Sequence, residues 1–302
     1  REPLRLRYRG ATVTTVPPPS AGGVALAQAL GMLERFEAGD SRAPQYAHLV
    51  VEALRRAFED RARYLGDPDF VEVPLARLTS AEYLAERARG IPAAAARGAA
   101  QAPAPAGEAA RGNTTHFSIV DAEGNRVAAT LSLNHLFGSG ILAAGVLLNN
   151  EMDDFSLAPE HPDSYRLRGG AANAVAPGKR PLSSMTPAFV EDGKGVLVLG
   201  APGGPRIVSQ VLLAVLDYVH APVADLEAIL GAPRYHHQWW PDRVEVEPEG
   251  FSAEWRSALQ AKGHRIEAAK RKWGNMQIVF ESKRDGRAVT ASDPRGADVG
   301  WY

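Results

Sequence analysis

The stretch Asn113-Thr114-Thr115-His116-Phe117-Ser118-Ile119-Val120 marks the point at which the character of this sequence changes. Residues 116–120 and 126–132 alternate in polarity on either side of Asp121-Ala122-Glu123-Gly124-Asn125, whose composition is typical of a turn. This pattern predicts a β-hairpin at the start of the second half of the chain. A threonine at the beginning of a strand usually reflects β-propensity alone, so the role of Thr114 depends on the rest of the sequence.

A compositionally biased segment lies immediately before the hairpin. Of the 21 residues from 92 to 112, 11 are alanine, three are proline and three are glycine, and they show no core-forming periodicity. This composition is typical of a flexible linker. We therefore divide the chain into residues 1–113, which end in the linker 92–113, and residues 114–302. We expect both parts to belong to one structural domain.

The residues before the linker are predicted to be mainly helical. A short β-branched strand is expected at 11–16, where three prolines follow it. Ser20 then occupies an N-cap position, and leucines at helical spacing predict a helix that continues to Gly39. A second helix is predicted at 44–65, and Thr79-Ser80-Ala81-Glu82 reads as a capping box that begins a third.

Beyond the hairpin, the second half of the chain alternates between strands and helices. Short apolar and β-branched runs predict the strands, and apolar positions at helical spacing predict the helices. The strands are expected at 188–190, 196–199, 244–246, 277–280 and 288–291, and the helices at 205–219, 224–230 and 252–262. This order suggests a layered sheet-and-helix architecture that is split across the linker.

The bulk composition excludes several classes of protein. The 302 residues include 34 Lys and Arg against 35 Asp and Glu, and a net charge of −1 argues against a protein that binds nucleic acid. No apolar run approaches the ~18 residues of a membrane-spanning helix. Because there is no cysteine, disulfides, thiolate zinc sites and cysteine nucleophiles are excluded. We expect neither a metal nor a cofactor.

Three local motifs are attractive but weak. Residues 138–143 match the loose dinucleotide fingerprint, yet the helix that should follow is missing. His236-His237 has no third metal ligand at a suitable spacing, so we expect both rings to pack beside Trp239 and Trp240. The basic run Lys270-Arg271-Lys272-Trp273 is predicted to be a solvated face and not an RNA site.

Five further motifs, each unspecific alone, together carry a family resemblance. They are Asn113-Thr114-Thr115-His116, Leu131-Ser132-Leu133-Asn134, Asn149-Asn150-Glu151-Met152-Asp153-Asp154-Phe155, Arg180-Pro181-Leu182-Ser183-Ser184-Met185 and Ala201-Pro202-Gly203-Gly204-Pro205-Arg206. In this order, and over almost the whole chain, they resemble the γ-glutamyltransferases (glutathione hydrolases) of the N-terminal-nucleophile hydrolase superfamily. The resemblance implies an α+β fold, a four-layer αββα sandwich. Residues 1–113 resemble the C-terminal part of the large subunit, and residues 114–302 the small subunit.

The resemblance also implies a self-activating nucleophile. The chain would cut itself between Asn113 and Thr114, and Thr114 would then carry a free α-amine. An α-amine with a pKa near 8 has an appreciable neutral fraction at pH 7, so it can accept the proton of the Thr114 hydroxyl. Ser132 would assist the nucleophile at a position where the family usually has threonine. Gly203 and Gly204 would offer backbone N–H groups to the oxyanion.

The substrate-binding residues are likewise implied by the resemblance. Asp154, Glu151 and the side-chain carbonyl of Asn134 would hold the α-ammonium group of a γ-glutamyl substrate, and the hydroxyls of Ser183 and Ser184 its α-carboxylate. Tyr165 resembles the aromatic residue of a lid loop that closes over the glutamyl group. The family also uses an arginine from the front half of its large subunit, which this sequence does not contain. Arg180 and Arg206 are not obvious replacements.

The expected activity is that of an autoprocessing γ-glutamyltransferase, which cleaves γ-glutamyl amides such as glutathione and transfers the glutamyl group to water or an amine. One alternative is a glutaryl-type cephalosporin acylase on the same scaffold, and a second is an inactive fragment that is never processed. The expected small-molecule partners are γ-glutamyl substrates. The two subunits that the cut produces are expected to stay associated with each other. The resemblance implies a periplasmic or secreted location.

Overall fold

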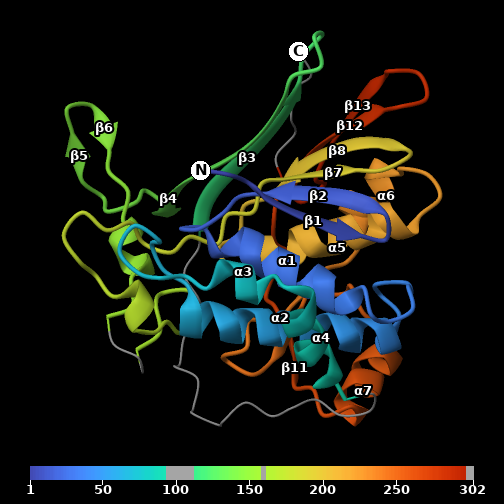
Figure 1. The fold of residues 1–302 in the computed structure, drawn as a ribbon, viewed down its shortest axis with the longest axis horizontal. Helices are drawn as coiled ribbons and strands as arrows, with labels where there is room; N and C mark the ends of the chain where they lie inside the picture. Colours follow the sequence, from blue (N-terminus) through green and yellow to red (C-terminus); the bar gives the residue numbers. More distant parts are fainter. Residues whose placement is uncertain (93–111, 158–160, 297–302) are drawn as a thin grey trace.

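The computed structural model describes residues 1–92, 112–157 and 161–296 (Figure 1). Within these ranges the predicted strands and helices are all present, with ends that differ by a few residues. The linker predicted at 92–113 lies outside the described residues except at its two ends.

One antiparallel sheet of six strands organises the molecule, in the order β1-β2-β7-β8-β12-β13. Strands from both sides of the linker join in this sheet, because β2, which precedes the linker, pairs with β7, which follows it, as Val13 does with Val190. The strands are β1 Leu4–Tyr8, β2 Ala11–Thr15, β7 Ala188–Glu191, β8 Gly195–Gly200, β12 Gln277–Ser282 and β13 Ala288–Ser292. The central strand β8 is buried along its whole length, which explains its continuous apolar sequence.

Helices cover one face of this sheet (Figure 1). Helix α1 (Ala21–Leu33) packs against α5 (Arg206–His220) and α2 (Pro44–Tyr64), and almost all of its residues are buried. It is apolar on nearly every side because it lies in the middle of the core. Shorter helices surround this layer: α3 Leu75–Leu78, α4 Ala81–Arg89, α6 Leu226–Gly231 and α7 Ala253–Ala261. A small sheet of β9 (Tyr235–His236), β10 (Val244–Val246) and β11 (Ile266–Ala268) lies beside them.

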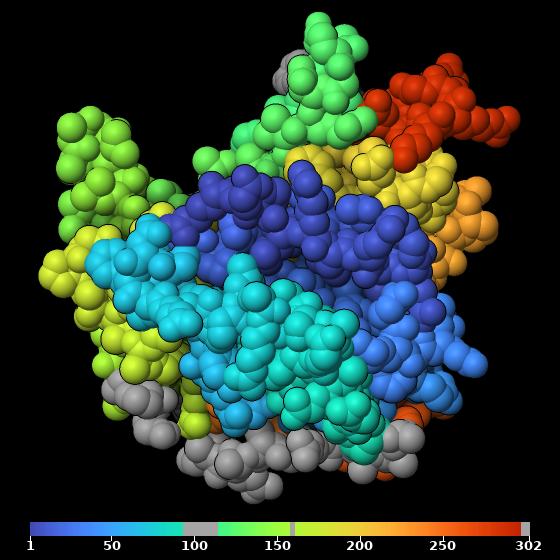
Figure 2. Space-filling view, in the orientation of Figure 1, coloured from blue at the N-terminus to red at the C-terminus, as the bar shows by residue number. Residues whose placement is uncertain are grey.

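The predicted hairpin, β3 (Gly112–Val120) with β4 (Arg126–His135), packs on the other face of the sheet against β8 and β12. Its polar side chains, among them Thr114, His116 and Ser132, point toward the sheet. The outward face carries Phe117, Ile119 and Leu131, which are 42 %, 48 % and 52 % exposed. Figure 2 shows the hairpin standing out from the body, with the small β5–β6 arm (Leu142–Ala143 and Val146–Leu147) beside it.

The described residues therefore form three layers: helices, the six-stranded sheet and the hairpin. The fold is mixed α and β as expected, but a second helical layer, the fourth of the predicted sandwich, does not occur within residues 1–92, 112–157 and 161–296. The apolar outward face of the hairpin has the pattern of a surface that is normally buried.

Two local predictions were wrong in detail. The helix expected to reach Gly39 ends at Leu33, because the N–H groups of Arg35 and Phe36 bond to carbonyls three residues back and tighten the last turn. The capping residue of α4 is Ser80, whose hydroxyl accepts from the N–H of Tyr83. Thr79 instead donates to the carbonyl of Leu75 and ends the preceding helix.

Five strands were not predicted: β1, β5, β6, β9 and β11. Strands β5 and β6 have only two residues each. Strand β1 alternates leucine and arginine at the edge of the sheet, a pattern that was visible in the sequence, whereas β9 and β11 have two and three residues. In the part of the chain that the structure describes, no helix has both the length and the apolar character needed to cross a membrane. The same residues contain no group of three His, Asp or Glu side chains that could bind a metal ion.

Candidate active site

Two cavities meet beside Thr114 and Tyr165. The larger has a volume of about 670 Å³ and is also lined by Gly203 and by side chains of the small sheet. The smaller is lined by Thr114, Tyr165 and the other residues predicted to bind substrate, namely Ser132, Asn134, Glu151, Asp154, Ser183 and Ser184, together with Gly204. Every catalytic and substrate-binding residue proposed from the sequence therefore lines one of these two cavities. The smaller one has room for about one water, so a ligand enters it only when side chains shift.

Thr114 and Ser132 face each other across the hairpin. They are directly paired in the register of β3 and β4, and their hydroxyl oxygens are 3.0 Å apart. The hydroxyl oxygen of Ser132 also accepts the backbone N–H of Asn134 at 2.8 Å. Because Ser132 is held by this second bond, its hydroxyl can fix the orientation of the Thr114 hydroxyl.

A β-bulge lies beside this pair. The register of β3 and β4 shifts between Gly112 and Thr114, and Asn134 adopts a left-handed backbone conformation (φ 68°). Such bulges redirect a side chain out of the regular strand pattern. The hydroxyl of Tyr165 donates to the backbone carbonyl of Asn134 at 2.9 Å. The side-chain nitrogen of Asn134 donates to the carbonyl of Asn150, which leaves its side-chain oxygen as the acceptor in the pocket.

An acid pair occupies one side of the smaller cavity. Glu151 and Asp154 lie on one short 3-10 turn (Glu151–Asp154). Burial, and then repulsion by Asp163 and Glu151, raises the pKa of Asp154 to about 8. Burial also raises the pKa of Glu151, although hydrogen bonds with Asp154 and Ser132 oppose this effect. The pair therefore holds a proton near neutral pH, and a bound cation would displace it.

The backbone between β8 and α5 forms another wall of the site. Gly203 and Gly204 have φ values of 138° and 57°, and a Cβ at Gly204 would come within 2.8 Å of the Tyr165 ring. Glycine is required here both for the conformation and for the close approach. In the described part of the chain, neither backbone N–H donates to another residue. Two free donors thus lie at the start of a helix, where an anion is favoured.

Ser183 and Ser184 lie where the start of α1 meets the segment before β7. The backbone N–H of Ala21 donates to the carbonyl of Ser183 at 2.8 Å. A Cβ at Gly22 would come within 2.8 Å of the Ser184 carbonyl oxygen, so the helix start touches this segment. The N-terminus of α1 therefore adds positive potential beside the two hydroxyls.

Comparisons with known proteins agree on one family. The family model described as gamma-glutamyltranspeptidase matches residues 1–301. The glutathione hydrolase proenzyme of Escherichia coli is 44 % identical over 99 % of this chain and 52 % of its own length. The chain belongs to the gamma-glutamyltranspeptidase family.

Two solved structures extend this result. A cephalosporin acylase from Bacillus halodurans aligns with a TM-score of 0.80 at 26 % identity, over 97 % of this chain and 51 % of its own. A T380A mutant of Helicobacter pylori gamma-glutamyltranspeptidase is 37 % identical with a TM-score of 0.57, over 60 % of this chain and 100 % of its own. The chain spans about half the length of the curated relative from Escherichia coli.

The arginines near this site differ in whether a carboxylate already binds them. Arg180 makes a bidentate pair with buried Asp67, and Arg206 makes one with Glu245. Both guanidinium groups are therefore already bound to carboxylates. Arg61, which the sequence reasoning missed, lines the smaller cavity from α2. Burial lowers its pKa, and the charges of Asp163 and Asp154 oppose that effect.

The weak motifs have structural explanations. His236 and His237 are both buried, and they bond to Ser209, Gln238 and Asp242, so they pack as predicted. Of the run predicted to be solvated, Lys270, Arg271 and Lys272 are exposed, but Trp273 is buried. The three basic residues also line the larger cavity beside Thr114. Arg166 lines the same cavity and was not identified from the sequence. Only the fold brings the basic run and Arg166 together, so no local feature of the sequence could have shown that they share a cavity.

Proposed function

We propose that this chain carries the catalytic centre of a γ-glutamyltransferase that cleaves γ-glutamyl amides such as glutathione. The observation that carries the proposal is the hydroxyl pair of Thr114 and Ser132, 3.0 Å apart, at the meeting point of the two cavities. Family membership supports it. An acid pair on one side and free backbone donors on the other match the two charges that the reaction must bind.

The proposed reaction begins with cleavage between Asn113 and Thr114. The new α-amine of Thr114 takes the hydroxyl proton while the hydroxyl oxygen bonds to the γ-carbonyl carbon. The oxyanion that forms accepts hydrogen bonds from the backbone N–H groups of Gly203 and Gly204. The carbon–nitrogen bond then breaks, the amine leaves with the proton, and a glutamyl ester remains on Thr114. Water or an amino-acid amine attacks this ester and regenerates the hydroxyl.

The proposed recognition of the glutamyl group uses opposite ends of the smaller cavity. Glu151 and Asp154 receive the α-ammonium group, with the side-chain oxygen of Asn134 as a further acceptor. Ser183 and Ser184 donate to the α-carboxylate, supported by the N-terminus of α1. Tyr165 closes the cavity through its bond to Asn134.

A second candidate is a cephalosporin acylase, since the solved cephalosporin acylase from Bacillus halodurans shares this fold. The acid pair disfavours it, because a glutaryl group has no ammonium to bind between Glu151 and Asp154. Release of glutamate from a γ-glutamyl anilide, compared with release of glutarate from a glutaryl anilide, distinguishes the two functions. Faster glutaryl cleavage would favour the acylase.

We also propose that a longer protein completes the four-layer sandwich. A further helical layer would cover the apolar face of the hairpin, and the curated relative from Escherichia coli is about twice as long as this chain. The proposed subunits, which meet at Asn113 and Thr114, stay associated because β2 and β7 lie in one sheet. For the location we retain the periplasmic or secreted compartment, which fractionation of cells would test.

Thr114→Ala tests the proposed function directly. In the full natural chain that contains these residues, we expect the variant to stay uncut and to release no amine from a γ-glutamyl anilide. Thr115→Ala is the matched control, because Thr115 is the next residue and is exposed. Denaturing gels and mass spectrometry report the cut, and a normally processed Thr114→Ala chain would overturn the assignment.

A further inference from the structure

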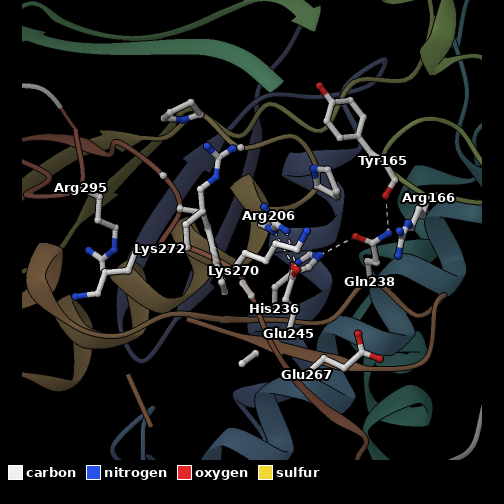
Figure 3. A pocket seen from close by; sticks show the side chains of 18 of the residues that line it. Tyr165, Arg166, Arg206, His236, Gln238, Glu245, Glu267, Lys270, Lys272 and Arg295 are labelled. Atoms are coloured by element: carbon white, nitrogen blue, oxygen red, sulfur yellow. Dashed lines mark hydrogen bonds and ion pairs between the residues drawn. The ribbon is translucent and has the colours of Figure 1, made fainter. Parts of the chain in front are cut away.

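The larger cavity, on the side of Thr114 away from the acid pair, has a strongly basic lining. Arg166, Arg206, Arg243 and the run Lys270-Arg271-Lys272 contribute to it, whereas Glu245 and Glu267 are its acidic members. Figure 3 shows the labelled members of this set around one hollow, with Lys270 and Arg206 in its middle. A cavity of about 670 Å³ with this charge is suited to a small anion-bearing ligand.

Both acidic side chains of this lining are already paired with arginines other than Arg166. Glu245 forms a bidentate pair with Arg206, with both distances 2.8 Å. Glu267 binds Arg243 and Arg265. The two carboxylates of the lining are therefore neutralised by these arginines. The net positive charge of the cavity comes from its other basic side chains.

Arg166 is a buried basic member of this lining whose guanidinium has no partner within the described residues. Its side chain is only 7 % exposed, yet no hydrogen bond or ion pair of its guanidinium occurs among residues 1–92, 112–157 and 161–296. In Figure 3 it lies beside the Gln238 side chain on the cavity wall. Burial and then the charge of Arg243 lower the pKa of Arg166. A buried unpaired cation is unfavourable, and a bound anion would relieve this cost.

The backbone places Tyr165 and Arg166 at the boundary of the two cavities. Arg166 has a left-handed conformation (φ 63°), and its N–H donates to the carbonyl of Asp163 at 2.8 Å. A residue with a Cβ adopts this conformation at a cost, and glycine would adopt it freely. The turn nevertheless carries arginine. This turn directs the two neighbouring side chains to different cavities. The hydroxyl of Tyr165 bonds to Asn134 at the smaller cavity, while Arg166 lines only the larger one.

We propose that Arg166, on the wall of the larger cavity, makes the reaction selective for amine components that carry a carboxylate. This inference rests on the proposed function, because the amine component is defined by the bond that Thr114 cleaves. The larger cavity receives the amine that leaves the donor and the amine that attacks the ester. Short peptides and amino acids with a free carboxylate are the ligand class, and the positive charges of Lys270, Arg271 and Lys272 attract them to the cavity.

The test compares two donors that differ in one charge, γ-glutamylglycine and γ-glutamylglycine amide. The readout is the ratio of their kcat/KM values in the full natural chain, measured as released glutamate. We expect the unaltered protein to prefer the carboxylate donor and Arg166→Gln to lower the ratio about 10-fold or more, mainly through KM. Arg166→Lys keeps the charge and should retain part of the preference.

Arg284→Gln is the matched control, because Arg284 is exposed on the turn after β12 and does not line the cavity. It should leave the ratio unchanged. A ratio that is the same in Arg166→Gln and in the unaltered protein would overturn this inference alone. If neither donor releases glutamate from the processed, unaltered protein, the proposed function itself fails. Thermal unfolding of Arg166→Gln shows whether a changed ratio reflects misfolding.

Discussion

At the scale of single residues, the candidate site consists of small polar groups that neighbouring groups hold in place. The Thr114 hydroxyl is oriented by Ser132, which in turn is held by the N–H of Asn134. The motif order pointed to each of these residues, but their mutual distances depend on the register of β3 and β4. A shift of one residue would turn Thr114 to the outward face of the hairpin.

Asp154 makes the free energy of unfolding depend on pH. Its pKa in the folded chain is about 8, against 3.8 in an unfolded one, so the folded state alone holds this proton between about pH 4 and pH 8. Stability therefore falls as the pH rises through that window. Asp163, with a pKa raised by burial to about 7, acts in the same direction.

We therefore expect Asp154→Asn to raise the free energy of unfolding at pH 8, by about 1 kcal/mol or more, and to change it less at pH 5. The same variant should lose γ-glutamyl turnover, because the ammonium group loses a charged partner. Denaturant unfolding at the two pH values measures the first effect, and steady-state kinetics the second. An equal change in stability at both pH values would contradict the raised pKa.

At the scale of elements, a buried ionic network joins the small sheet to the end of the six-stranded one. Arg295 makes a bidentate pair with Glu247 at 2.6 and 2.7 Å, and Arg234 binds Asp293 at 2.6 Å. The Glu247 carboxylate also accepts the N–H groups of Arg234 and Trp273. The side chains of all four charged residues are at most 6 % exposed, so each depends on its partner.

Glu247→Gln should lower the free energy of unfolding by about 3 to 5 kcal/mol, since it leaves the buried Arg295 without its main counter-charge. Glu249→Gln makes the same chemical change two residues away on an exposed side chain, and we expect it to cost about 0.5 kcal/mol or less. Chemical denaturation of both variants measures the difference. Similar losses in both would show that the network contributes little.

At the scale of the whole molecule, the hairpin is the element whose environment is incomplete. Its polar face meets the sheet, while Phe117, Ile119, Val127 and Leu131 face outward. This polarity is the reverse of that of an ordinary surface hairpin. It fits the proposal that a further layer covers the hairpin in a longer protein.

Ile119→Thr tests that arrangement. In the 302-residue chain, where Ile119 is 48 % exposed, we expect a small loss of stability, whereas in the longer natural protein we expect about 1 to 3 kcal/mol. Ile278→Thr, at a buried position of β12, is the control that should destabilise both forms. Equal, small effects of Ile119→Thr in the two forms would argue that nothing covers the hairpin.

The sequence by itself determined the local elements and the types of residue that make up the candidate site. Helical spacing in α2 and α5, the strand runs of β8 and β12, and the motifs around Thr114, Asp154 and Gly204 are all properties of neighbouring residues. Predictions were wrong where two neighbouring residues could fill the same position. Both Thr79 and Ser80 could cap α4, and the structure uses Ser80. Short strands such as β9 were missed because two residues carry no periodicity.

Only the tertiary structure decided which distant residues share a cavity and which charges remain unpaired. Arg166 and Lys270 are about a hundred positions apart in the chain, and the basic run around Lys270 resembled an ordinary solvated surface. Pairing of Arg180 with Asp67 and of Arg206 with Glu245 likewise depends on packing. The physical reason is that periodicity and capping act over a few residues. Burial and charge pairing are set by the sum of contacts that distant segments make once the chain is folded.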